Sequence, residues 1–313
     1  MADNWVVFDD GNFGHSFIIE QVEVISKLQN INKWVIVSTI MIDESISFEF
    51  GMSPVATRED RYEYERFYEK TDPDLVLLAR KLHASSYMGE GFVYDGAVSE
   101  DGTMADDMDK ARGQAVEYYI GYEPIDDERI PVSTLRKISL ESYETVKDLP
   151  GYQLSKDYLY EEEGEWLDSI APRRIQEISS FGHIPESPST AGLELLRTVL
   201  QDSVGKDEMW FFTMVSEKYN TLVKLFGPEA VRRIGDSIPL DDPRVANISL
   251  VPAIVDTSIF FQQVYESAIN ETVPAIRRRR IGVLTNFTEG LTEAQMGSDV
   301  FLLTRGVAET TDA

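Results

Sequence analysis

The chain of 313 residues contains no cysteine, and this absence excludes several kinds of chemistry. A disulfide framework, a thiol nucleophile and a cysteine-ligated zinc or iron–sulfur site each require that residue. Histidine is almost as scarce, with 3 residues at His15, His83 and His183. They lie far apart in the sequence and form no H-E-x-x-H pair, so a metal-centred enzyme is not expected.

Long apolar runs and an excess of basic residues are also missing. No segment approaches the roughly 18 apolar residues of a transmembrane helix, and no basic region followed by an apolar one opens the chain. The 29 Lys+Arg stand against 55 Asp+Glu, for a net charge of −26. Such a field repels nucleic acid, which excludes a general DNA or RNA binder. We therefore expect a cytoplasmic protein without a transmembrane segment.

The residues that are present predict a globular α/β protein. Apolar residues make up 42% and aromatic residues 11% of the chain, which is the balance of a folded domain. Hydrophobic periodicity predicts alternating strands and helices in the second half and a hairpin before them. The predicted helices cover 17–28, 74–88, 191–202, about 219–226 and a last one capped by Asp256; the predicted strands cover 34–41, 46–50, 116–122, 130–138, 175–184, 209–215 and 247–251.

This order predicts a mixed sheet and three parts of the chain. Residues 1–65 form an N-terminal extension of unknown role, residues 66–256 the central domain, and residues 257–313 a C-terminal helix and tail. The charged stretch from Glu59 to Asp74 is expected to be a solvated connector or helix. The segment 148–174, with its acidic run, is expected to be a mobile excursion.

Four short motifs in a fixed order add to this pattern. They are R-K-L-H-A-S-S-Y-M-G-E-G-F-V at 80–93, D-x-x-D at Asp106 and Asp109, V-S-T-L-R at 132–136 and E-I-S-S at 177–180. Together they resemble the acyl-homoserine-lactone synthases and the N-acyl amino acid synthases, which are branches of the GNAT-type acyltransferase superfamily. The resemblance spans residues 74–256.

That resemblance implies a GNAT-like fold and an N-acyltransferase. The enzyme would move an acyl group from acyl carrier protein or coenzyme A to an amine of amino acid type by direct attack. The acyl thioester is then a substrate, and no cofactor is permanently bound. The alternative is a catalytically inactive binding or regulatory protein that kept the fold.

Departures from the family pattern bear on both readings. Ser133 stands where the family has glycine, and Ser180 stands where the autoinducer synthases have arginine. The second departure argues against S-adenosylmethionine as a substrate. The R/Q-x-x-G-x-G/A loop of coenzyme-A-binding relatives is absent from the junction at 183–192. These departures favour the non-catalytic alternative.

Glu177 and Arg136 are the candidate catalytic residues. Glu177 lies in the middle of a largely apolar strand, with Ser179 and His183 expected on the same face. A carboxylate in such a place is costly unless it is paired or functional, and a base is what amine attack requires. Arg136 on the preceding strand would orient that carboxylate or bind an acceptor carboxylate. The alternatives are an exposed face and a cross-strand ion pair.

The candidate substrate-binding residues are Asp106, Asp109, Tyr87 and Ser179. The resemblance implies an acidic pair at the two aspartates, although a solvated D-x-x-D in so acidic a chain is the alternative. Tyr87 follows His83 by four positions on one helix face, where simple packing is the alternative.

Two further segments are candidates for binding the acyl thioester donor. Ser189, Thr190, Ala191 and Gly192 open a helix whose free N–H groups would hold a pantetheine phosphate, although every helix start offers some of this. Arg277, Arg278, Arg279 and Arg280 form a basic cluster expected at or just past the end of a helix. It would dock an acidic acyl carrier protein; the alternative is a solvated helix end.

Overall fold

A mixed eight-stranded sheet forms the centre of the computed structural model, which describes residues 62–68, 70–104, 115–125, 128–184 and 190–311. The strand order is β1-β2-β3-β4-β5-β8-β6, and β7 pairs with β8. The strands are β1 (Glu63–Tyr68), β2 (Val116–Ile125), β3 (Glu128–Ser139), β4 (Ile175–His183), β5 (Met209–Val215), β6 (Arg232–Arg233), β7 (Ile238–Pro239) and β8 (Ser249–Asp256). The mixed α/β class predicted from the sequence is confirmed.

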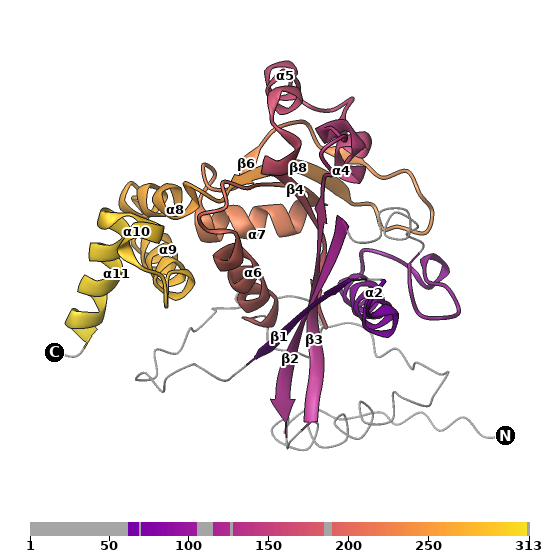
Figure 1. Cartoon of the computed structure of the whole chain (residues 1–313), viewed down its shortest axis with the longest axis horizontal. Coiled ribbons are helices and arrows are strands. Elements are labelled where there is room, and N and C mark those ends of the chain that lie inside the picture. Colours follow the sequence, from indigo (N-terminus) through magenta and orange to yellow (C-terminus); the bar gives the residue numbers. More distant parts are fainter. Residues whose placement is uncertain (1–61, 69, 105–114, 126–127, 185–189, 312–313) are drawn as a thin grey trace, which may run out of the picture. The chain divides into compact units, whose positions relative to one another are not determined.

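Helices cover both faces of this sheet, with α2 on one side and α6 and α7 on the other (Figure 1). The described α-helices are α2 (Pro73–Gly89), α4 (Pro150–Ser155), α5 (Glu161–Ser169), α6 (Thr190–Ser203), α7 (Ser216–Phe226), α8 (Phe260–Ile269), α9 (Pro274–Phe287), α10 (Glu293–Met296) and α11 (Ser298–Thr311). Short 3-10 turns occupy Asp95–Ala97, Val146–Asp148 and Pro172–Arg174. The helices predicted over 74–88 and 191–202 and the predicted hairpin are confirmed.

Strands β4 and β5 pair in parallel, whereas the other pairs among the described strands are antiparallel. Its ladder runs from Ile175, opposite Met209, to Ile178, opposite Phe212. Beyond that point β4 continues along β3 to His183, while β5 continues along β8. The two strands therefore part, and no strand among the described residues pairs with the edge of β4 that faces β5 from Ser179 onward. We call this place the β4–β5 opening.

Apolar side chains pack on each side of the sheet. On the side of α6 and α7, Trp210 and Phe212 of β5 lie in one cluster with residues of α8 and α9. On the side of α2, Phe211 lies in a second cluster. Strand β5 is thus buried on both faces, as its continuous apolar run predicts.

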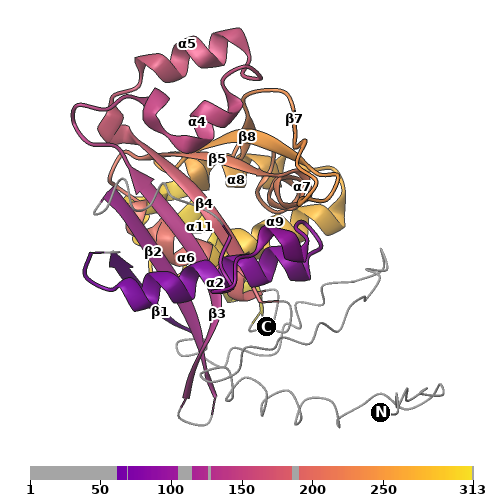
Figure 2. The same cartoon turned by 90° about the vertical axis from the view of Figure 1, so that its right-hand side faces the viewer.

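The segment 148–174 is a correction to the sequence analysis. It holds α4 and α5 above the sheet (Figure 2), not a mobile excursion. Leu149 and Leu167 are each 0% exposed, and both belong to the apolar cluster on the α2 side. Leu149 precedes Pro150 and Leu167 follows the acidic run Glu161–Glu165, and neither belongs to a periodic apolar pattern that would have marked it.

Two other expectations are wrong in detail. The charged stretch after Glu59 contains the strand β1, whose Phe67 is 2% exposed, so the predicted domain boundary at residue 65 falls inside a strand. Asp256 ends β8 and accepts hydrogen bonds from Ser258, and Ile259 is the residue before α8. Asp256 is therefore not the helix cap.

The elements predicted over 17–28, 34–41 and 46–50 lie outside the described residues. Within the part of the chain that is described, no helix has both the length and the apolar character needed to cross a membrane.

Candidate functional site

A β-bulge at Ser180 re-aims the side chains of β4 beside the opening. Arg136 of β3 is opposite Ser179 and Thr134 is opposite Gly182, so β4 has one extra residue in this interval. Ser180 absorbs it with a left-handed backbone, φ 50°, which is uncommon for a residue other than glycine. A bulge shifts the alternation of side chains between the two faces by one position.

The shift places His183 away from Glu177. Phe181 and His183 lie beside Gly192 of α6, because a Cβ on that glycine would be 3.4 Å and 3.6 Å from them. Gly182 instead lies beside Ser86 of α2. The expectation that His183 shares the face of Glu177 is therefore wrong, since period-2 reasoning assumes an unbroken strand.

Two polar residues of α2, and the residue that follows its last turn, approach the opening from the other side of the sheet. His83, Tyr87 and Glu90 follow one another at helical spacing, and the rings of His83 and Tyr87 meet edge to face at 4.3 Å. Burial lowers the pKa of His83 to about 3, and the charges of Arg136 and Lys218 add to the shift. His83 is therefore a neutral imidazole at physiological pH. Burial, with the carboxylate of Glu90, raises the pKa of Tyr87.

Arg136 lies on β3 next to these residues and is 6% exposed. Its Nε donates a hydrogen bond of 2.9 Å to the Oγ of Ser179, its cross-strand partner. The residue directly opposite Glu177 is Ile138. Arg136 and Glu177 are hence diagonal neighbours in the ladder, and Arg136 and Ser179, both candidate site residues, are brought into direct contact.

Glu177 lies at the last part of the β4–β5 ladder and is 4% exposed. Its Oε2 accepts a hydrogen bond of 2.7 Å from the backbone N–H of Gly151, in the first turn of α4. The same glycine accepts a 3.3 Å hydrogen bond from the Oγ1 of Thr213. The mid-strand carboxylate is thus buried and hydrogen-bonded, as its place in an apolar strand requires.

Lys218, in the first turn of α7, reaches the opening from the face opposite α2. Its Nζ forms an ion pair of 3.0 Å with Glu90, and the two side chains are 15% and 26% exposed. It also donates a hydrogen bond of 3.0 Å to the carbonyl oxygen of Phe181. Burial lowers the pKa of Lys218, and the carboxylate of Glu90 opposes that shift. A cation is thereby held at the edge of β4 that β5 has left.

Sequence reasoning missed Glu90 and Lys218. Glu90 has a weak signal, because it continues the helix face that carries His83 and Tyr87. Lys218 has none that links it to Glu90, since the two lie on helices far apart in the sequence and meet only through the fold.

Some of the residues predicted to bind the acyl donor and the amine acceptor lie outside the described residues. Asp106, Asp109 and Ser189 are not among the described residues. Thr190 begins α6 and lies 3.4 Å from the hydroxyl of Tyr62. The next two positions of that helix, Ala191 and Gly192, are buried. Gly192 lies beside the side chains of Phe181 and His183 of β4.

The basic cluster is not at or past the C-terminal end of a helix, which is a correction. Its residues occupy the first half of α9, which starts at Pro274, so the helix dipole disfavours them. Arg280 is 9% exposed and forms an ion pair of 3.0 Å with Glu271. Arg277 and Arg278 are exposed. Because Glu271 compensates the charge of Arg280, the cluster presents fewer than four positive charges to a partner.

Two other features of the described residues bear on what this protein can bind. Among these residues, no group of three or more His, Asp or Glu side chains is placed to hold a metal ion. A small cavity on the α6 and α7 side of β5 has a wholly apolar lining and offers no polar group for chemistry. It is lined by Leu196, Leu200, Trp210, Phe212, Leu222, Phe226, Val231, Val255, Phe260 and Phe287.

Comparison with known proteins gives matches to solved structures only. No family model matches the sequence, and no curated protein matches it either. FeeM, an N-acyl amino acid synthase from uncultured soil microbes, is 14% identical with a TM-score of 0.47 and covers 67% of this chain and 99% of that chain. The acyl-homoserine-lactone synthase LasI is 15% identical with a TM-score of 0.44 and covers 64% of this chain and 91% of that one.

A GNAT-type acetyltransferase from Kribbella flavida is 13% identical with a TM-score of 0.36, and covers 63% of this chain and 98% of that one. These are the kinds of protein that the sequence motifs resemble. The likeness concerns the arrangement of strands and helices and carries no information about substrates.

Proposed function

We propose that this protein is an acyltransferase that moves an acyl group from a thioester to an amine of amino acid type. The observation that carries the proposal is the β4–β5 opening, where a buried group of polar side chains lies next to a strand edge that has no partner strand among the described residues. The donor is an acyl carrier protein or coenzyme A thioester. The acceptor is a small-molecule amine.

The opening suits the pantetheine arm that such thioesters share. This arm is an extended chain with amide groups, and extended chains bind an exposed strand edge through main-chain hydrogen bonds. The edge of β4 runs from Ser179 toward the start of α6 at Thr190. Residues Ser189, Thr190, Ala191 and Gly192 would hold the phosphate at the far end of the arm, since helix N-termini bind anions.

The chemistry is assigned to the α2 side of the opening. Glu177 takes the proton of the attacking amine, directly or through a water molecule. Arg136, fixed by Ser179, orients the acceptor, and Tyr87 with Asp106 and Asp109 contributes to its binding. Because the chain has no cysteine, an acyl-thiol intermediate on the protein is excluded, and we propose direct attack of the amine on the thioester.

Arg277, Arg278, Arg279 and Arg280 are proposed to dock an acidic carrier protein, with the exposed Arg277 and Arg278 as the main contacts. Since the glycine loop of coenzyme-A-binding relatives is absent, we expect acyl carrier protein to be the better donor. Side-by-side kcat/KM values for the same acyl group on both carriers test this preference, which a higher value for coenzyme A contradicts.

A thiol assay tests the proposed activity with unusual clarity. The chain has no thiol of its own, so a thiol reagent reports only coenzyme A or carrier thiol released from the donor. Acyl donors of several chain lengths are offered with a panel of amines and amino acids, and the N-acyl product is identified by mass spectrometry. Thiol release that depends on the amine supports acyl transfer. Its absence with every donor overturns the proposal.

The same experiment distinguishes an acyltransferase from the alternative, a catalytically inactive binding or regulatory protein. Coenzyme A or carrier protein that raises the melting temperature without any thiol release indicates a binding protein that kept the opening. The departures at Ser133 and Ser180 are the features that favour this outcome.

A further inference from the structure

We propose that Lys218 is a catalytic residue of the acyl transfer, whose ammonium group binds the thioester carbonyl oxygen and stabilises the negative charge that forms there. The inference rests on the proposed function. It assigns a role to a side chain that no motif in the sequence marks.

The first argument is the position of the group. Nζ of Lys218 lies 3.0 Å from the carbonyl oxygen of Phe181, on the part of β4 beyond Ile178, where its pairing with β5 ends. The proposed route of the thioester between the two strands lies next to this atom. The ammonium already binds one carbonyl oxygen here, so a second carbonyl oxygen meets a donor of the correct kind.

The second argument is a donor that remains available. An ammonium group has three N–H donors. Among the residues that the structure describes, Phe181 and Glu90 are the hydrogen-bond acceptors of Nζ. One N–H is thus left for a ligand.

The third argument is that the surroundings hold the charge in place. Nζ lies 4.8 Å from the ring centre of Tyr87, 5.7 Å from that of Phe92 and 5.8 Å from that of Phe181. Ring faces attract cations, and Glu90 supplies the counter-ion. A fixed cation in a site with little water stabilises developing charge far better than one in bulk solvent.

The step balances without a further reactant. The amine nitrogen forms a bond to the carbonyl carbon, and the π electrons of the carbonyl move onto its oxygen, beside Lys218. When the C–S bond breaks, those electrons re-form the carbonyl, and the thiolate leaves with the sulfur electrons. The proton lost by the amine goes to the base and then to the thiolate, so Lys218 keeps its proton throughout.

Glu90 is a positioning residue in this scheme. Its carboxylate raises the pKa of the buried lysine against the effect of burial. Removal of that charge in Glu90→Gln should lower the pKa of Lys218 and move the alkaline limb of the kcat profile to lower pH. A residue that only supports the fold would lower activity at every pH alike.

The main test is the kinetics of Lys218→Met and Lys218→Arg in the full chain, with the thiol assay. We expect Lys218→Met to lower kcat by about 10²–10³-fold with KM for the donor little changed, the scale of one lost oxyanion donor. Lys218→Arg keeps the charge and should recover part of the loss.

The matched control is a second buried lysine ion pair among the described residues, Lys137 with Glu208. Their atoms lie 2.8 Å apart and their side chains are 7% and 11% exposed. Lys137→Met should reduce the melting temperature at least as much as Lys218→Met yet keep kcat. Equal losses of kcat in both variants would overturn the inference, because fold stability would then explain them.

Two other results separate this inference from the proposed function. Amine-dependent thiol release by the wild type together with normal kcat in Lys218→Met overturns the role of Lys218 alone. A lower KM with unchanged kcat in that variant also overturns it, since Lys218 would then obstruct the donor. No thiol release by the wild type overturns both.

Discussion

The carboxylate of Glu177 accepts the backbone N–H of Gly151 at 2.7 Å, so the candidate base also fixes the first turn of α4. Gly151 is the residue that permits this approach. A Cβ at that position would lie 2.7 Å from the Oγ1 of Thr213, 2.9 Å from the ring of Phe211 and 3.1 Å from the carboxylate itself. The position of Glu177 thus depends on a small residue in another element.

Glu177→Gln should separate the two roles of this residue. The amide oxygen of glutamine still accepts the hydrogen bond of Gly151, so we expect the melting temperature to change little. Glutamine is not a base, so turnover in the thiol assay should fall by about 10²–10⁴-fold. Wild-type turnover in this variant would remove Glu177 from the mechanism.

Gly151→Ala should destabilise the fold. The added methyl group must displace Thr213 and Phe211 in a packed core, and such overpacking costs about 1–3 kcal/mol in the free energy of unfolding. Denaturant titration measures this change. Gly164→Ala in α5 is the matched control, because a Cβ there meets nothing within 4 Å and alanine favours a helix. A Gly151→Ala variant as stable as its control would contradict the close approach.

His83 should make stability fall in mild acid. Its folded pKa of about 3 lies below the ordinary value of 6.5, so the unfolded chain binds the extra proton between these pH values. Stability is therefore fully present above about pH 6.5 and is lost as pH falls. Between pH 6.5 and 5 we expect wild type to lose about 1–2 kcal/mol more than His83→Gln, measured by denaturant titration. Parallel pH profiles would show that His83 is not buried neutral.

Charge reversal at the start of α9 tests carrier docking. Arg277→Glu with Arg278→Glu should raise KM for a carrier-protein donor several-fold at low salt and leave kcat unchanged. Charges at the rim of an interface act mainly on the rate at which the partners associate. The effect should therefore vanish near 1 M salt, where the Debye length is about 3 Å.

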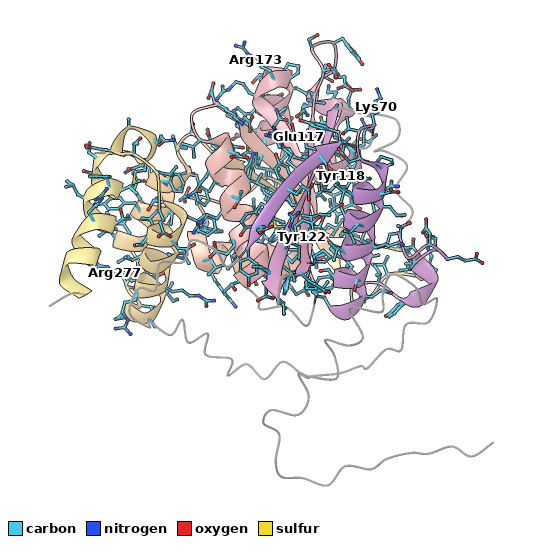
Figure 3. The ribbon with its side chains drawn as sticks, turned by 60° about the horizontal axis from the view of Figure 1, so that its bottom comes forward. Lys70, Glu117, Tyr118, Tyr122, Arg173 and Arg277 are labelled. Atoms are coloured by element: carbon cyan, nitrogen blue, oxygen red, sulfur yellow. The ribbon has the colours of Figure 1, made fainter. Side chains whose placement is uncertain are left out.

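The control reverses two exposed charges elsewhere, in Lys70→Glu with Arg173→Glu. Lys70 and Arg173 lie at a distance from Arg277 (Figure 3) and change the net charge by the same amount. An equal rise of KM in both double variants would assign the effect to the overall field. An undiminished effect in high salt would indicate a structural role for the arginines.

Local pattern in the sequence determined most of the regular elements near the site. The apolar run at 209–215 predicted a doubly covered strand, and Trp210, Phe211 and Phe212 are buried on its two faces. Helical periodicity placed α2 and α6 within one residue of their observed ends. These predictions hold because the spacing of apolar residues along the chain shows directly whether one face of an element is buried or both are.

Other features depended on the tertiary structure. The acidic composition of 148–174 concealed the anchors Leu149 and Leu167, whose burial needs the sheet to be present. The bulge at Ser180 reversed the face of His183, because an extra residue in one strand is visible only against its partner. Lys218 and Glu90 meet because α7 and α2 approach the β4–β5 opening from opposite faces. The sequence alone determined most of the elements around the site, whereas the divergence of β4 and β5 decided which side chains from separate elements meet there.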